Sequence, residues 1–480
     1  MPKNESTLAG VGMMALLTIA SKLVRLVALM ITARFVTPEG FGVVASFTMV
    51  LAVAYLLAGM GMVRTIIQRP ILNEFHIGSA LRISILTSAL IFILLFFYGG
   101  VIENLTGIVG VSASLAVASS LFIFLPFSNI CSAIFQRDGK VVFIGKVQAA
   151  CTVLGNILIT IPLLWIDFGY WAIIIGAVVS DLIGQLIILW FGRKFITLKY
   201  NLDSTREIIK YSSIFLFNNI IEITSRQIDI AMVGRTLGAI ALGSYSRATQ
   251  LIEFPSQIYF LVVDRVVFPM MSSLSLHKEK STNFFLNTFS ILSLGLSVCI
   301  LILYFGAYEI IAIMMGDQWA MVPPLLQILA ISIYFKCISR FMDSYLSAIG
   351  KVKIMTFKQI VFLCLLLPAI WFGLDYGVTG VAVGMTIALF LRFLITASIV
   401  IFTSSLSLTQ CSKVIVPTLI SMSIIVAIQS IVQQFYYIEG LLAILISTLL
   451  WLVISFIYPQ NIFLTDNGCV FVKKLKSKYL

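Results

Sequence analysis

The chain has 480 residues, of which 60% are hydrophobic and only 11% are charged, and its formal net charge is +12. Soluble domains carry about 25% charged residues because their surface faces water, so this composition excludes a soluble protein and indicates a chain embedded in lipid. The seven cysteines contain no CxxC pair and the two histidines lie in separate polar loops, which predicts neither a disulfide framework nor a metal site.

The predicted elements are long apolar helices. A helix that crosses the hydrocarbon core needs about 20 mostly apolar residues. In chain order, the stretches that meet this criterion are 8–33, 40–63, 77–98, 112–132, 143–166, 169–190, 211–233, 240–262, 284–306, 323–347, 354–374, 377–402, 413–434 and 439–458. The first stretch contains two cations and no small-residue cleavage site, so we interpret it as a retained helix. The predicted fold class is therefore an all-α integral membrane protein with about 14 transmembrane helices.

Lysine and arginine are distributed unevenly between the two sides of the membrane. With a cytoplasmic N-terminus, 22 of the 32 fall in cytoplasmic loops and ends, only Arg34 and Arg235 fall outside, and eight lie within spans. The cytoplasmic group includes Lys358, counted with the loop before the span 354–374. Because cytoplasmic loops carry the excess of positive charge, both ends of the chain are predicted to be cytoplasmic.

Short motifs recur in the two halves of the chain. Residues 34–42 and 235–243 each place an arginine eight residues before a glycine, Gly139-Lys140-Val141 recurs as Gly350-Lys351-Val352, and Asp167, Gly169 and Gly176 recur as Asp375, Gly377 and Gly384. An even number of spans per copy predicts two parallel six-helix repeats with a pseudo-two-fold axis along the membrane normal. The predicted organisation is an N-terminal lobe at 1–190, a cytoplasmic linker at 191–210, a C-terminal lobe at 211–402, and two extra helices with a basic tail at 403–480.

Ionisable residues occur inside the predicted spans, where charge is costly and usually faces the bundle interior or a water-filled path. Seven of the eight span cations are candidate site residues, namely Lys22, Arg25, Arg226, Arg247, Lys336, Arg340 and Arg392, whereas the eighth, Arg265, lies beside Asp264 near the cytoplasmic end of 240–262. The candidate coupling carboxylates are Asp181, Glu222, Asp229 and Asp343, and Glu253 also lies within a span. Two interpretations stay open. These groups form structural ion pairs, such as Glu222–Arg226 and Arg340–Asp343 within one helix, or the cations line a cavity that attracts a phosphate-bearing substrate.

Two absences bear on the class of protein. No GxxxxGK[ST] nucleotide-binding loop occurs, and no predicted outer loop is long enough to hold a catalytic site. The sequence therefore predicts a protein that is not an enzyme and needs no cofactor. A membrane glycosyltransferase or polymerase is the enzyme alternative.

Several motifs resemble those of one group of transporters. They are Ala33-Arg34-Phe35 with Gly40-Phe41-Gly42, Gly59-Met60-Gly61 with Ile67-Gln68-Arg69, Leu242-Gly243-Ser244-Tyr245-Ser246-Arg247-Ala248, Gly316-Asp317-Gln318-Trp319 followed by proline, and Ala348-Ile349-Gly350-Lys351. In this order, and with this number of spans, the chain resembles the multidrug/oligosaccharidyl-lipid/polysaccharide (MOP) exporter superfamily. Within it, the chain is most similar to the Wzx-type branch that includes O-antigen and colanic-acid flippases.

The resemblance implies a flippase of the bacterial plasma (inner) membrane. It would move undecaprenyl-pyrophosphate-linked oligosaccharide units to the outer leaflet by alternating access, driven by an ion gradient. We predict that the seven span cations line the substrate cavity and that the four carboxylates couple the ion. The expected partners are this lipid-linked substrate, membrane lipids and the polysaccharide polymerase and chain-length machinery, without nucleic acid. A peptidoglycan-precursor flippase and a multidrug or cation antiporter of the same superfamily remain alternatives.

Overall fold

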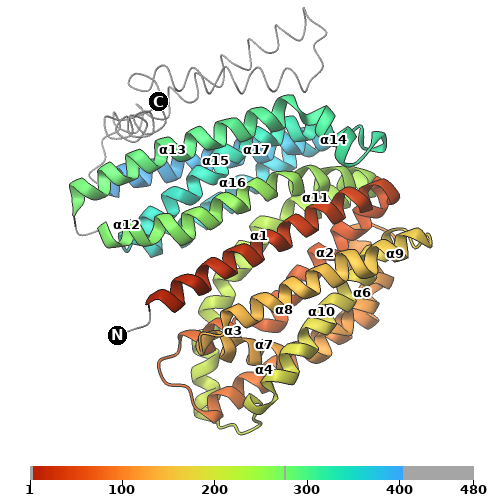
Figure 1. Ribbon diagram of the computed structural model, residues 1–480. Coiled ribbons are helices and arrows are strands. Elements are labelled where there is room, and N and C mark those ends of the chain that lie inside the picture. The colour runs from red at the N-terminus through yellow and green to blue at the C-terminus, as the bar shows by residue number, and fades with distance from the viewer. Residues whose placement is uncertain (1–3, 275–276, 404–480) are drawn as a thin grey trace, which may run out of the picture. The chain divides into compact units, whose positions relative to one another are not determined.

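The computed structural model describes residues 4–274 and 277–403, and all regular secondary structure in these ranges is helical (Figure 1). This confirms the predicted all-α class. The chain divides into two compact units, each of which is described by itself. Unit 1 is Met1–Ser246 with Met314–Gln318, and unit 2 is Arg247–Ile313 with Trp319–Leu480.

The helices of unit 1 follow the apolar runs of the sequence. They are α1 (Asn4–Phe35), α2 (Pro38–Gly59), α3 (Met62–Gln68), α4 (Glu74–Phe97), α5 (Gly99–Thr106), α6 (Val111–Ser119), α7 (Leu121–Arg137), α8 (Val141–Val153), α9 (Thr160–Trp165) and α10 (Tyr170–Gly192), followed by the start of α11 (Leu202–Val262). A π-helical turn joins α8 to α9, and a short 3-10 turn follows α10. Within the unit, α7 packs against α3, α4 and α10, and α8 packs against α1.

Side chains fix the starts of two of these helices. The Thr37 hydroxyl accepts a hydrogen bond from the backbone N–H of Gly40 at 3.2 Å and so caps α2. The Glu103 carboxylate accepts the N–H groups of Ser112 and Gly110 at 2.8 and 3.2 Å, at the start of α6. The hydrogen bonds from Ser112 and Gly110 hold the pKa of the Glu103 carboxyl below its ordinary value.

The segment after α10, where the cytoplasmic linker was predicted, is tied to the start of α4. The Lys199 ammonium lies 2.7 Å from the Glu74 carboxylate. The Glu207 carboxylate accepts a hydrogen bond from Arg69 and lies 3.3 Å from the His76 ring nitrogen. Arg69 first, and His76 second, hold the pKa of Glu207 below its ordinary value.

Two glycines let α2 and α11 approach backbone to backbone. A Cβ added to Gly42 would lie 2.1 Å from the carbonyl oxygen of Ala239, and one added to Gly243 would lie 1.8 Å from the carbonyl oxygen of Pro38. Gly42 and Gly243 are 201 positions apart, and so are Pro38 and Ala239. The contact is therefore reciprocal between the recurring segments 34–42 and 235–243, and it depends on residues without side chains.

Unit 2 is built around one buried helix. Its elements are the rest of α11, a π-helical turn (Val263–Val267), α12 (Phe268–Leu274), α13 (Lys278–Phe305), α14 (Ala307–Met314), α15 (Val322–Ala348), α16 (Val352–Leu374) and α17 (Gly377–Thr403), with a 3-10 turn at Asp317–Trp319. α15 packs against α13 and α17, and α17 packs against α16. Most side chains of α15 are buried.

The described residues contain nine helical stretches that are long and apolar enough to cross a membrane, and the pair α6 and α7, bent by 50°, makes a tenth. α11 covers two further predicted spans, 211–233 and 240–262, which meet at Gly238, where φ is 81° and only glycine is unstrained. The protein is thus a multi-pass membrane protein, as predicted. The predicted spans 413–434 and 439–458 lie outside the described residues, so the total of about 14 spans stays a prediction.

Two of the recurring motifs adopt matching conformations. Gly139 and Gly350 have φ values of 77° and 78°. In both turns the lysine that follows donates its N–H to the carbonyl oxygen five residues earlier, at 2.8 and 2.9 Å, as in a Schellman C-cap. Gly169 and Gly377 also share a positive φ. These turns lie in different units, and their agreement supports the predicted duplication.

Candidate functional site

α15 of unit 2 carries three charged side chains on one face. Lys336, Arg340 and Asp343 follow one another at the predicted i, i+4, i+7 spacing, which places them along one side of the helix. Their partners come from the turns and helices around α15. We call the whole group the α15 charge cluster, which consists of Lys336, Arg340, Asp343, Glu253, Asp264, Lys358 and Arg392.

Two of the three α15 side chains pair with the end of α11 and the turn after it. Lys336 forms an ion pair with Glu253 of α11, and Arg340 Nη2 donates to Asp264 Oδ2 at 2.7 Å. Asp264 lies in the π-helical turn Val263–Val267. Such turns interrupt the regular register of a helix and are frequent at functional sites. The side chains of Asp264 and Arg340 are 43% and 46% exposed, so this pair is open to a ligand.

Asp343 is the buried centre of the cluster. Its Oδ1 accepts a hydrogen bond from the Lys358 ammonium of α16, and its Oδ2 lies 3.5 Å from Arg392 Nη2 of α17. The side chains of Asp343 and Lys358 are almost wholly buried, whereas that of Arg392 is 22% exposed. The Arg392 guanidinium also lies 4.8 Å from the centroid of the Phe362 ring. One carboxylate therefore joins α15 to both α16 and α17.

The α15 charge cluster has more cations than carboxylates, and several of its side chains are partly exposed. Four cations face three carboxylates, and the Nε of Arg392 is buried without a hydrogen-bond partner among the residues that the structure describes. Breaking a buried ion pair is costly, but a half-exposed pair can exchange one anion for another at little cost. Guanidinium groups bind phosphate through two parallel hydrogen bonds. The arrangement can therefore accept a phosphate in place of an exposed carboxylate.

Two predictions about this cluster were wrong. The pair Arg340–Asp343, weighed as a contact within one helix, does not form, because each side chain reaches a different neighbour. Lys358, counted with a cytoplasmic loop, is buried in α16 and bound to Asp343. Its position four residues inside the predicted span 354–374 was the signal that could have identified it.

In unit 1, the structure brings Arg25 and Asp181 together. Tyr55 Oη of α2 donates to Asp181 Oδ2 at 3.0 Å, and Arg25 of α1 interacts electrostatically with the same carboxylate. Lys22, one turn earlier in α1, is half-buried, while Arg25 and Asp181 are exposed. The sequence analysis missed Tyr55, since a tyrosine within an apolar span has no local feature that indicates a carboxylate partner.

The predicted charges of α11 occupy different environments. Arg226 and Glu222 form the predicted pair within one helix, at 2.9 Å, and both are exposed. Asp229 is buried and accepts a hydrogen bond from Tyr245 Oη at 2.8 Å. Arg247 is half-buried in the part of α11 that belongs to unit 2. The predicted ion pair of Glu222 and Arg226 within one helix therefore forms.

Sequence comparison gives a family match over most of the chain. A family model described as a polysaccharide biosynthesis protein matches residues 31–324. The lipopolysaccharide biosynthesis protein WzxC of Escherichia coli (strain K12) is 22% identical over 398 residues, which cover 82% of this chain and 79% of that protein.

Structure comparison gives the same fold. The Lipid II flippase MurJ in an inward closed conformation superposes with a TM-score of 0.74 at 18% identity, and the match covers 93% of this chain and 98% of that one. An inward-facing multidrug resistance MATE family transporter of the MOP superfamily gives 0.60 at 15% identity, over 79% and 94% of the two chains. These TM-scores show that the chain shares its fold with the Lipid II flippase and with this transporter of the MOP superfamily. The two matched structures are those of a flippase and of a transporter, which agrees with the prediction that this chain is not an enzyme.

Proposed function

We propose that this chain, which belongs to the polysaccharide biosynthesis protein family, is a flippase for polyprenyl-pyrophosphate-linked oligosaccharide units in the bacterial inner membrane. It moves them from the inner to the outer leaflet for surface polysaccharide export. The observation that carries this proposal is the α15 charge cluster, in which four cations outnumber three carboxylates inside a membrane protein. Ionisable side chains within membrane-spanning helices are rare, and they often mark a path for a polar substrate.

In this proposal the diphosphate of the substrate binds Arg340 and Arg392. Both guanidinium groups are partly exposed, and the diphosphate would take the place that Asp264 occupies beside Arg340. Asp343 and Lys358 stay buried and hold α15 to α16, so the exchange leaves the core of unit 2 intact. Lys336 would add a further positive charge one turn along the same face of α15.

The finer architecture belongs to the same proposal. We infer about 14 spans with both ends in the cytoplasm, two parallel six-helix repeats, and alternating access by movement of lobes 1–190 and 211–402 about the pseudo-two-fold axis. The linker 191–210 would connect these lobes, and residues 403–480 would supply two further helices. The matching turns at Gly139 and Gly350 and the reciprocal contact of Gly42 and Gly243 support the repeat.

The other charged residues of the predicted spans have proposed roles in substrate passage and in ion coupling. We propose that Lys22, Arg25, Arg226 and Arg247 contribute positive potential to the substrate path. Among the candidate coupling carboxylates, which are Asp181, Glu222, Asp229 and Asp343, Asp181 is favoured. The Asp181 side chain is exposed and accepts a hydrogen bond from a tyrosine hydroxyl. Asp229 and Asp343 are buried, and each accepts a hydrogen bond from a neighbouring side chain.

Two related functions differ from this proposal in one feature each. A peptidoglycan-precursor flippase would use the same diphosphate chemistry, and the similarity to the Lipid II flippase fold favours keeping it as a second candidate. A multidrug antiporter for small cations is disfavoured because the excess positive charge of the α15 charge cluster would repel a cationic drug.

The test is flipping of a lipid-diphosphate-linked oligosaccharide in proteoliposomes. Arg340→Gln and Arg392→Gln should each reduce the initial rate by about tenfold or more, which corresponds to the loss of one charge-assisted phosphate contact. Arg193→Gln, which removes an exposed guanidinium beside Trp190 just after α10, is the matched control and should keep the rate. Wild-type rates for both cluster variants would contradict the proposal, and transport that persists with an ionophore would remove ion coupling.

A further inference from the structure

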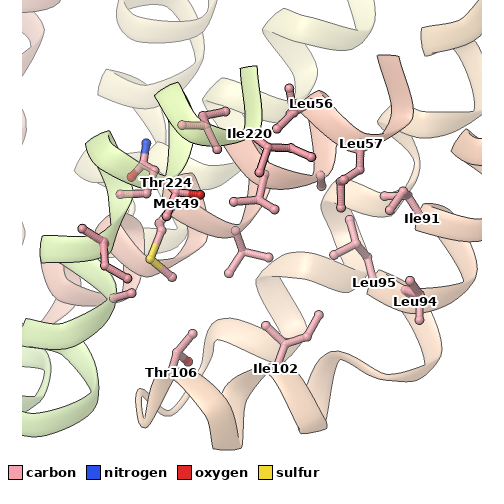
Figure 2. Close-up of a pocket in the computed structure, with 17 residues that line it drawn as sticks. Met49, Leu56, Leu57, Ile91, Leu94, Leu95, Ile102, Thr106, Ile220 and Thr224 are labelled. Carbon is pink, nitrogen blue, oxygen red and sulfur yellow. The ribbon is translucent and has the colours of Figure 1, made fainter. Parts of the chain in front are cut away.

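Unit 1 contains an apolar cavity that the charged residues do not touch. It has a volume of about 490 Å³ and lies between α2, α4, α5 and the first segment of α11 (Figure 2). Of the 17 residues that line it, only Thr106, Thr224 and Gln227 are polar. A cavity with walls of this kind does not hold water and selects a hydrocarbon.

The cavity is open at its edge. Val53, Leu57, Leu94 and Ile220 line it, and each of these large apolar side chains is more than a third exposed. In a protein that spans a membrane, apolar surface of this kind meets lipid hydrocarbon. A hydrocarbon chain can therefore enter from the side and fill it.

One helix separates this cavity from charged residues. On α11, Ile220, Thr224 and Ala231 recur at spacings of four and seven and face the cavity. Glu222 and Arg226 lie on the opposite side of the same helix and are exposed. The side of α11 that faces the cavity is thus mainly apolar, and its ion pair lies on the other side.

We propose that this cavity holds a segment of the polyprenyl chain of the lipid-linked substrate, which rests on the flippase function proposed above. An apolar cavity of about 150 Å³ accommodates a six-carbon ring, so 490 Å³ accommodates about 20 carbon atoms, or about four isoprene units. The remainder of a long polyprenyl chain stays in the bilayer. Because lipid tails are as apolar as the cavity walls, the chain is held by close packing and not by a hydrophobic driving force.

The test compares substrates of two chain lengths in the full-length protein in proteoliposomes. Leu57→Trp and Ala231→Phe each add bulk to the cavity from a different helix, so a folding failure of one leaves the other. Either variant should raise the half-saturating concentration of the undecaprenyl substrate by about tenfold. The half-saturating concentration of a short geranyl analogue should change by less than about twofold. Equal effects on both substrates, or no effect on either, would overturn the proposal.

A matched control is available within the same unit. Ala89 lines a second apolar cavity, of about 290 Å³, between α4 and α7, and Ala89→Trp adds similar bulk there. This variant should transport both substrates at the wild-type level. If it has the same effect as Leu57→Trp, the effect comes from added bulk in general and the proposal is wrong.

A second measurement identifies the occupant without a transport assay. A photoreactive benzoylphenylalanine in place of Leu57 should crosslink to the undecaprenyl substrate in detergent-free membranes, and added substrate should reduce crosslinking to phospholipid. Phospholipid adducts that do not change with added substrate would show an ordinary lipid site and overturn the proposal. If wild-type protein flips no substrate while the polyprenyl adduct forms, then the proposed function fails and the cavity assignment stands.

Discussion

Replacing Asp343 by asparagine should destabilise the protein more than replacing Lys358 by methionine, although the two residues form one ion pair. Asp343 is the carboxylate shared by Lys358 and Arg392, so Asp343→Asn leaves two cations close together without a counter-ion. Removal of one member of a buried pair costs about 3–5 kcal/mol. After Lys358→Met, Asp343 still faces the Arg392 guanidinium at 3.5 Å. At an effective dielectric constant of about 20, that contact is worth about 5 kcal/mol before desolvation is counted.

The expected costs in free energy of unfolding are therefore about 4 kcal/mol for Asp343→Asn and about 1–2 kcal/mol for Lys358→Met. They can be measured by titrating sodium dodecyl sulfate into mixed micelles and following helix content. The double variant should cost less than the sum of the single variants, because the two residues are in contact. A Lys358→Met variant that is as unstable as Asp343→Asn would show that Arg392 does not hold Asp343, and the argument from the shared carboxylate would fail.

Three further outcomes are expected. Gly243→Ala should prevent the close approach of α11 to α2 and cost about 3 kcal/mol of stability. Gly100→Ala, whose Cβ meets no atom within 4 Å, should be nearly neutral in the same sodium dodecyl sulfate titration, and equal costs for the two variants would contradict this reasoning. Tyr245→Phe should lower the free energy of unfolding by about 2 kcal/mol, because it removes the hydroxyl that donates to the buried Asp229 carboxylate. Tyr55→Phe should cost clearly less, because its partner Asp181 is exposed, and equal costs would contradict this reasoning. Glu103→Gln should lower Tm at neutral pH, because a carboxyl whose pKa lies below the ordinary 4.5 stabilises the fold above that pH and stops doing so as pH falls through its folded-state pKa. A Tm difference between the variant and the wild type that does not shrink at all as pH is lowered below 4.5 would be the contrary result.

The features that could be predicted from the sequence are local in the chain. The helices were predicted from apolar stretches of membrane length. The shared face of Lys336, Arg340 and Asp343 on α15 was predicted from their spacing, since both features depend only on neighbouring residues. The pair Glu222–Arg226 was also predictable for this reason. The family resemblance, carried by motifs along the chain, agrees with the family match and the fold.

The partners of the charged residues could not be predicted, because they are set by tertiary packing. Arg340 reaches Asp264, 76 positions away, and not Asp343 three residues along its own helix. Lys358 was placed in a loop because counting charges for topology treats a lysine near a span end as cytoplasmic. Its burial depends on Asp343, 15 positions earlier in the preceding helix, and no pattern within α16 indicates this.

The reciprocal contact of Gly42 with Ala239 and of Gly243 with Pro38 bears on the origin of the protein. When residue i of one copy touches residue j of another and j touches i in return, the interface is isologous and a two-fold axis passes through it. In the proposed duplication, these four positions are two pairs of equivalents. The ancestor would then be a six-helix chain that dimerised through the glycine that corresponds to Gly42 and Gly243, before gene fusion joined the two subunits. Its two halves, expressed as separate chains, should still assemble through the same glycine contact.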